Sequence, residues 1–181
     1  MSGLRLAMIA VLAVSVVACA PVPPDPSPTP TGSTPAPSSS AIPDQLDLRE
    51  RVACDILAGA ALERLGMAST PVDRDTGPTA TTCAWKSVDG AVGIELTVNH
   101  GVGLELLDQL GGQLEERVPL AVGGYPAVRM DRLDSPTCRI AVGVADSQAF
   151  SAGASSLSTT APPLCPLAEA LAEEVVSALR G

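Results

Sequence analysis

A tract of Pro, Ser, Thr, Ala and Gly at residues 20–43 restricts where this 181-residue chain can fold. Asp25 is its only charged residue, and it has no hydrophobic periodicity to drive collapse, so it predicts a disordered tether. In polyproline II, which this proline content favours, its 24 residues would reach up to about 75 Å. Folding is therefore expected of residues 44–181, whose 138 residues suit a single globular domain.

The segment before the tract, residues 1–18, has the pattern of a secretory signal peptide. Arg5 supplies a positive start, and Leu6–Val17 is an apolar run without charge. The run is only 12 residues long, whereas a helix that spans a bilayer needs about 20. It therefore fits the hydrophobic region of a signal peptide better than a transmembrane helix, and we expect its removal on export.

Cys19 follows the apolar run in the order Val16-Val17-Ala18-Cys19, which resembles the bacterial lipobox. In that motif a branched apolar residue and a small residue precede a cysteine that is acylated and becomes the mature N-terminus. We expect lipidation at Cys19, with residues 19–43 as the lipidated tether. The alternative is an ordinary signal peptide that contains a cysteine. Two or more acyl chains anchor a protein stably, so the predicted location is the outer face of the cell membrane.

Charge and aromatic content exclude some classes of partner. Without Arg5, 20 acidic residues face 10 basic ones, and the formal charge is near −10. The chain lacks the basic footprint of a nucleic-acid-binding protein, so no nucleic-acid partner is expected. Only Trp85, Tyr125 and Phe150 are aromatic, so we expect a core of small aliphatic groups and no recognition by ring stacking.

Four cysteines remain after export, Cys54, Cys83, Cys138 and Cys165, an even number that predicts two disulfides in an oxidising compartment. Free thiols and a zinc site are the alternatives. No metal is expected, because zinc sites usually contain a close Cys-x-x-Cys pair and His100 is the only histidine. We favour the pairs Cys54 with Cys83 and Cys138 with Cys165, each of which would tie the start of a predicted helix to the start of a predicted strand.

Hydrophobic periodicity predicts an α+β domain with an antiparallel sheet flanked by N- and C-terminal helices. Val92, Ile94, Leu96 and Val98 alternate with small or polar residues, as in a strand with one buried face. Helices are expected at residues 48–65, 104–110 and 165–179. Gly59 can interrupt the first of these, and Gly66 ends it. Expected strands are residues 82–87, 92–99, 138–145 and 148–152, with extended chain at 117–130 bent at Gly123-Gly124.

Several segments taken together resemble one family. They are Cys54-Asp55-Ile56-Leu57, Cys83-Ala84-Trp85, VGGYPAV from Val122, CRIAVGVADSQAF from Cys138 and LCPLAEALAEEVVSAL from Leu164. The family is the actinobacterial lipoprotein family known as domain of unknown function 3558, and the resemblance covers nearly all of the predicted domain. It implies an exported, lipid-anchored, disulfide-bonded domain without an established activity, and it supplies no catalytic residue.

Motifs with chemical meaning are weak in this sequence, so we expect neither an enzyme nor a cofactor. His100 follows a predicted strand, but no nucleophile accompanies it, and a solvated turn histidine is the simpler interpretation. The serine-rich residues 151–163 lack a Gly-x-Ser-x-Gly elbow, and Gly101-Val102-Gly103 is too short for a dinucleotide fingerprint.

Acidic pairs and Trp85 are the other candidates for a site. Glu115-Glu116, Asp131 with Asp134, and Glu173-Glu174 lack the spacing of a calcium loop, so we interpret them as solvated surface. Trp85 is a core anchor on one interpretation and a ligand platform on the other.

Three functions of different kinds follow as hypotheses, of which an unrecognised enzyme is the least favoured. The first is a non-enzymatic binding or adaptor module for an envelope protein or a wall component. The alternative is a carrier or sensor of a small apolar or lipid ligand, which would need a cavity between sheet and helices. An enclosed apolar cavity would favour the carrier, whereas a continuous exposed apolar patch would favour the adaptor.

Overall fold

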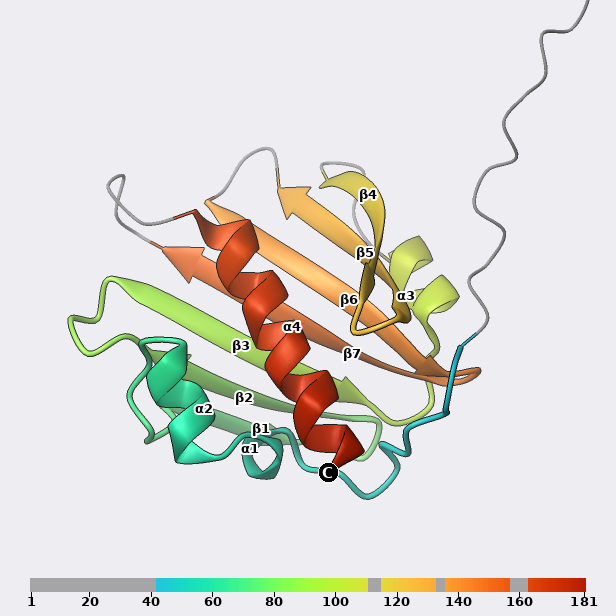
Figure 1. Ribbon diagram of the computed structural model, residues 1–181, viewed down its shortest axis with the longest axis horizontal. Coiled ribbons are helices and arrows are strands. Elements are labelled where there is room, and N and C mark those ends of the chain that lie inside the picture. The colour runs from blue at the N-terminus through green and yellow to red at the C-terminus, as the bar shows by residue number, and fades with distance from the viewer. Residues whose placement is uncertain (1–41, 111–114, 133–135, 157–162) are drawn as a thin grey trace, which may run out of the picture. The chain divides into compact units, whose positions relative to one another are not determined.

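The computed structural model describes residues 42–110, 115–132, 136–156 and 163–181, all of which belong to one compact unit, Pro37–Gly181. Within these ranges, seven strands form one antiparallel sheet in the order β1-β2-β3-β7-β6-β5-β4 (Figure 1). The predicted α+β class with an antiparallel sheet is confirmed. The elements are α1 (Ala53–Ile56), α2 (Gly59–Arg64), β1 (Asp73–Thr76), β2 (Ala80–Lys86), β3 (Val92–Asn99), α3 (Leu104–Leu110), β4 (Glu115–Val122), β5 (Tyr125–Arg132), β6 (Thr137–Ala145), β7 (Gln148–Ser156) and α4 (Leu164–Arg180).

Alternating burial and tight turns explain the sheet. In β3 the four apolar residues from Val92 to Val98 are buried, while the residues between them are half-buried or exposed. Gly90 in the β2–β3 turn has a φ of 72°, and Gly123 and Gly124 in the β4–β5 turn have φ values of 55° and 87°. Positive φ at both central residues matches a two-residue hairpin turn, so the predicted bend is a full hairpin.

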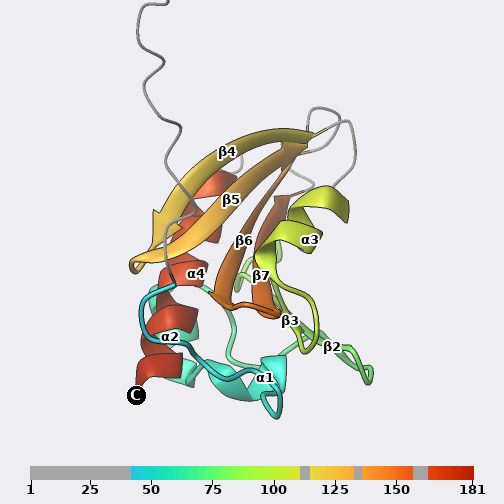
Figure 2. The ribbon, with the colours of Figure 1, turned by 90° about the vertical axis from the view of Figure 1, so that its right-hand side faces the viewer.

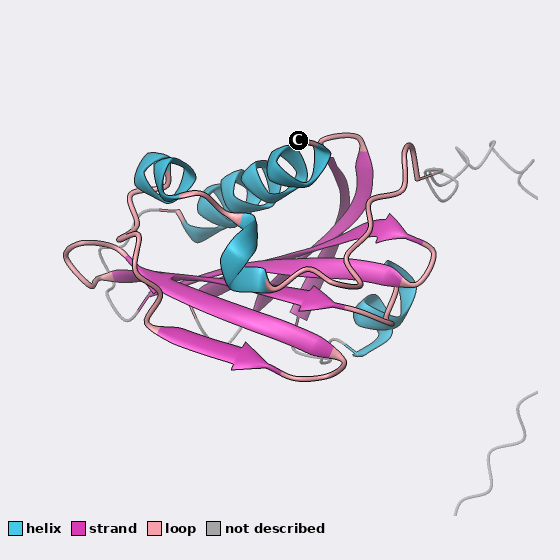
Figure 3. Cartoon of the chain, turned by 90° about the horizontal axis from the view of Figure 1, so that it is seen from below, coloured by secondary structure: helices cyan, strands magenta, loops and turns pink. Residues whose placement is uncertain are grey.

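Helices lie on both sides of the sheet. The apolar stripe of α4 packs on β6 and β7, with Ala168, Leu171, Ala172, Val175 and Val176 buried. Figure 3 shows α4, whose end is marked as the C-terminus, above the sheet together with the short N-terminal helices. Figure 2 shows α3 on the opposite side of β5–β7 from α4. No helix in the described ranges is long and apolar enough to cross a bilayer.

The predicted N-terminal helix over residues 48–65 is wrong in extent. Residues 42–52 form an irregular segment, which we call the N-terminal strap, and only α1 and α2 are helical. Leu57 and Ala58 are extended between them, and Gly66 ends the second helical piece with a φ of 74°. The sheet is therefore not flanked by one long N-terminal helix, and the described N-terminal contribution is two short helices beside α4.

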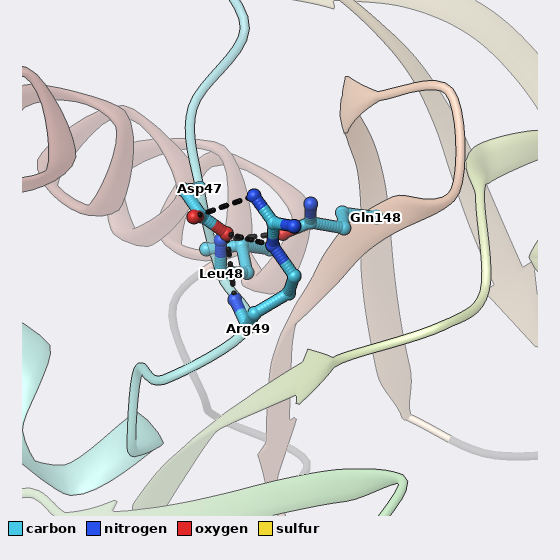
Figure 4. A network of polar contacts seen from close by, with 4 residues as sticks. All are labelled: Asp47, Leu48, Arg49 and Gln148. Carbon is cyan, nitrogen blue, oxygen red and sulfur yellow. Dashed lines mark hydrogen bonds and ion pairs between the residues drawn. The ribbon is translucent and has the colours of Figure 1, made fainter.

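Hydrogen bonds hold the N-terminal strap against one end of the sheet. The Leu48 N–H donates to the side-chain oxygen of Gln148 at the start of β7, and Leu48 is fully buried (Figure 4). Leu46 N–H donates to the Val144 carbonyl over 3.1 Å, and the Tyr125 hydroxyl donates to the Asp44 carbonyl over 2.6 Å. The chain therefore enters the fold where β6 ends and β7 begins.

A local ion pair shapes the exposed side of the strap. The Arg49 guanidinium and its backbone N–H each lie 3.0 Å from the Asp47 carboxylate (Figure 4). These hydrogen bonds from Arg49 lower the pKa of Asp47 to about 2. The carboxylate therefore stays charged across the physiological pH range.

Candidate functional site

The structure joins Cys54 to Cys83 and Cys138 to Cys165, the two pairs that the sequence favoured. The first disulfide links α1 to β2, and the second links β6 to the first turn of α4. Each closes a loop with a sequence separation of 29 or 27 residues. In the chain-entropy model, loops of this length contribute roughly 3 to 4 kcal/mol each. The lipidation candidate Cys19 lies outside the described residues.

Trp85 lies in the core. Its side chain is 1% exposed, on the same face of β2 as the buried Cys83. A ligand platform needs an accessible ring face, which this position does not offer. Trp85 is therefore a core anchor, and the structure gives no support to its interpretation as a ligand platform.

His100 is tied to the N-terminal strap. Its Nε2 lies 3.1 Å from the Arg51 carbonyl, and its backbone N–H donates to the Thr79 carbonyl over 2.9 Å. These contacts connect the end of β3 to the strap, so the described contacts of His100 are structural ones.

The predicted acidic candidates have different surroundings. Glu173 is exposed, as expected of a solvated face, and Asp134 lies outside the described residues. Glu174 is instead paired with Arg64 by two hydrogen bonds of 2.9 and 2.7 Å, which join α2 to α4. Hydrogen bonds from Arg64 hold the pKa of Glu174 below its ordinary value. The interpretation of this residue as merely solvated is wrong, because the tertiary position of α2 supplies its partner.

The sheet surface opposite α4 contains a cluster of small and polar residues, which we call the open face. It consists of Lys86, Gly93, Glu95, Thr97, Ser151, Gly153, Ser155, Thr137 and Arg139, all exposed or half-buried. Strand register sets them in rows: Glu95 and Arg139 are the neighbours of Gly153 on its two sides, and Ser155 lies between Gly93 and Thr137.

Two adjoining hollows lie on the open face. One has a volume of about 220 Å³ and is lined by Glu95, Arg139 and Gly153, among others, and the second, of about 570 Å³, lies beside Lys86 and Gly93. Both are lined by Thr137 and Ser155, so they form one continuous depression. Each hollow is open to solvent, and charged side chains stand at its rim.

Neither glycine on the floor of this depression is required by the fold. A Cβ at Gly153 would have its nearest neighbour at 3.8 Å, and one at Gly93 would lie 3.4 Å from the Ser155 hydroxyl. Neither residue has a positive φ. A glycine in a strand without a conformational reason often marks a place where a ligand or another backbone approaches closely.

Unused polar groups surround the depression. Within the described part of the chain, Lys86, Glu95 and Arg139 form no ion pair with one another or with other residues. The Thr137 hydroxyl is buried and has no hydrogen-bond partner among the described residues. The open face therefore offers charges of both signs to a partner.

The open-face hollows and the N-terminal strap lie at opposite ends of the central strands. The strap contacts Val144 and Gln148, whereas the hollows lie beside Thr137 in β6 and Ser155 in β7. Seven residues separate Thr137 from Val144, which corresponds to about 23 Å along a strand. The chain therefore enters the fold far from this depression.

Comparison with known families agrees with the resemblance seen in the sequence. The model of the family described as Protein of unknown function (DUF3558) matches residues 14–178, most of the chain. The chain belongs to the DUF3558 family. No curated protein and no solved structure matches it. Membership in DUF3558 brings no assigned activity, so the function is argued from the site itself.

The open face was not identified from the sequence. Its residues are the polar halves of alternating strands, and alternation alone does not say which solvent-facing surface forms a depression. A glycine inside a predicted strand was the one available signal, and only Gly93 gave it. Gly153 lies inside β7, but the strand predicted at 148–152 ended one residue before it.

Proposed function

We propose that this DUF3558 protein is an exported, lipid-anchored binding or adaptor module on the outer face of the cell membrane, without enzymatic activity. Cys19 carries the lipid, residues 20–41 form the tether, which ends where Ile42 of the strap packs against the core, and the folded domain presents its open face to an envelope protein or a wall component. The observation that carries this proposal is the separation between the strap, where the tether joins the domain, and the depression at the far ends of β6 and β7. A domain that is held to the membrane at the strap can present the depression at its opposite end to a partner.

The edges of the sheet favour recognition by a face over strand addition. The edge strand β1 has the sequence Asp-Arg-Asp-Thr and is exposed throughout, and the other edge strand, β4, contains Pro119. Charges and proline on edge strands discourage pairing with another chain. The open face is therefore the more suitable surface for a partner.

The carrier of a small apolar or lipid ligand remains the alternative hypothesis. Both open-face hollows are exposed and have charged rims, so neither resembles an enclosed apolar cavity. The exposed large apolar residues Val72, Val88 and Leu106 lie on separate segments, so the described surface also lacks the continuous apolar patch expected for the adaptor. The adaptor proposal therefore relies on the polar depression and its position.

Site-specific photocrosslinking in native cells tests the proposal. A photoreactive residue at Ser155 reports on the open face, and one at Glu173, which is also exposed, reports on the solvent side of α4. We expect a discrete crosslinked species with the Ser155 probe and none with the Glu173 probe. No product from either probe, or equal products from both, would contradict binding through the open face.

A further inference from the structure

The Cys138–Cys165 disulfide has a carboxylate directly against it. Asp131 Oδ1 lies 2.9 Å from Cys165 Sγ and 3.1 Å from Cys138 Sγ. The other carboxylate oxygen, Oδ2, lies 3.2 Å from Arg129 Nε. In the described ranges, this is the one group of three His, Cys, Asp or Glu side chains whose polar atoms all lie within 4.8 Å of one another. As a disulfide the two sulfurs carry no hydrogen, so neither donates to Oδ1.

The Cys54–Cys83 disulfide lacks such a carboxylate. Cys83 is fully buried, and no carboxylate of the described residues joins it and Cys54 in a comparable cluster. Burial does not distinguish the two pairs, because Cys54 and Cys165 are both half-buried, while Cys83 is 0% and Cys138 2% exposed. The pairs differ in the carboxylate beside the sulfurs and in the 17-residue helix α4, whose first turn contains Cys165. Cys165 is therefore the more exposed residue of its pair and the one at which we expect attack.

We propose that Cys138–Cys165 and Asp131 form a thiol–disulfide exchange site, whereas Cys54–Cys83 is a structural crosslink. The substrate class is a thiol, either a small molecule or a cysteine of another protein. This inference rests on the contacts of the disulfide and not on the adaptor function. It adds a chemical activity to a domain that the adaptor function treats as non-enzymatic.

The contacts of Asp131 define the step. The incoming thiol gives its proton to Oδ1, and its sulfur attacks Cys165 Sγ. The Cys138–Cys165 bond breaks, a mixed disulfide forms on Cys165, and the electron pair of the broken bond leaves on Cys138 Sγ. Asp131 then returns the proton to Cys138, which becomes a thiol. A second thiol attacks the mixed disulfide, releases the oxidised substrate as a disulfide and leaves Cys165 as a thiol.

Asp131 and the N-terminal turn of α4 both favour reduction of this disulfide. After reduction, the S–H groups of Cys138 and Cys165 can both donate hydrogen bonds to Asp131 Oδ1. The disulfide has no S–H group, so these hydrogen bonds stabilise only the reduced form. The N-terminal turn of a helix stabilises negative charge, which helps a sulfur at position 165 to act as a thiolate. We therefore expect Cys138–Cys165 to be reduced more readily than Cys54–Cys83.

Equilibration with glutathione and its disulfide tests the proposal on the full-length protein. After acid quenching and alkylation, peptide masses report the state of each cysteine pair. Cys138–Cys165 should open in buffers in which Cys54–Cys83 stays closed. Asp131→Asn should lower the equilibrium constant for opening about tenfold, or about 30 mV for this two-electron couple. The matched control is Glu169→Gln, which removes a carboxylate 3.8 Å from Arg129 and should leave the constant unchanged. Simultaneous opening of both disulfides in the unaltered protein, or no effect of Asp131→Asn, would overturn the proposal.

Single-cysteine variants test which sulfur reacts. With Cys138→Ser, the remaining Cys165 should form a mixed disulfide with oxidised glutathione. With Cys165→Ser, the buried Cys138 should react at least ten times more slowly. Equal rates, or faster reaction at Cys138, would contradict attack at Cys165.

Discussion

Gly143 and Gly153 lie in adjacent central strands, and the space that a side chain would fill is used differently at the two positions. A Cβ at Gly143 would lie 2.9 Å from Leu104 Cβ, so this glycine lets α3 pack against the sheet. Gly153 has no comparable neighbour and leaves open the floor of the depression. Two glycines in adjacent strands thus serve packing in one case and an open surface in the other.

Alanine substitutions should separate these two cases. Gly143→Ala should lower the free energy of unfolding by about 1 to 3 kcal/mol, because the added methyl group overpacks the contact with Leu104. Gly153→Ala should leave it unchanged or raise it by up to about 1 kcal/mol, because alanine restricts the unfolded chain. Urea unfolding measures both. A loss of stability in Gly153→Ala equal to that in Gly143→Ala would show that both glycines serve packing.

The Arg64–Glu174 pair predicts a pH dependence with a definite sign. Its partner lowers the pKa of Glu174 below the usual 4.5, so the pair stabilises the fold above that pH. The contribution is lost as the pH falls through the folded pKa. Glu174→Gln should cost up to about 1 kcal/mol at pH 7, since exposed pairs contribute little, and nothing at low pH. Thermal unfolding across pH measures the difference, with the exposed neighbour Glu173→Gln as control. An equal cost at all pH values would contradict an electrostatic role.

At the scale of elements, local patterns predicted β3, α3 and α4 well, whereas the strand predicted at 148–152 ended four residues before β7 does. Residues 92–99 and 104–110 were predicted with the bounds of β3 and α3, and α4 differs by one residue at each end. Tertiary contacts explain the failure at residues 48–52, because the Leu48 N–H bonds Gln148, which is 100 residues away. β1 was missed because its four residues are all exposed and carry no apolar alternation.

The cysteine pair Cys54 and Cys83, which links α1 to β2, should stabilise the fold only when it is oxidised to the disulfide. Cys83→Ser should lower the melting temperature by several degrees under oxidising conditions, because the closed loop restricts the unfolded chain. Under reducing conditions the variant and the parent should melt alike. Thermal unfolding with and without dithiothreitol measures this. An equal loss in both conditions would mean that the Cys83 sulfur matters for packing and not for bonding.

At the scale of the whole molecule, the proposed protein consists of a lipid anchor, a tether and a domain whose depression lies away from the point where the chain enters the fold. Cys19→Ala should release the protein from the membrane fraction, because acylation is the proposed attachment. Ser33→Ala, a change within the tether, should leave it bound. Cell fractionation followed by detection of the protein measures both. Retention of the Cys19 variant on the membrane would contradict lipid attachment at this residue.

Intact mass spectrometry of the protein extracted gently from its native membrane tests both the lipid anchor and the adaptor function. The denatured chain should begin at an acylated Cys19 and lack two hydrogen atoms for each disulfide. Under non-denaturing conditions the mass should include an additional protein or wall fragment that denaturation releases. A chain without acyl groups would contradict the anchor, and a bound small apolar molecule in place of a macromolecular partner would contradict the adaptor function.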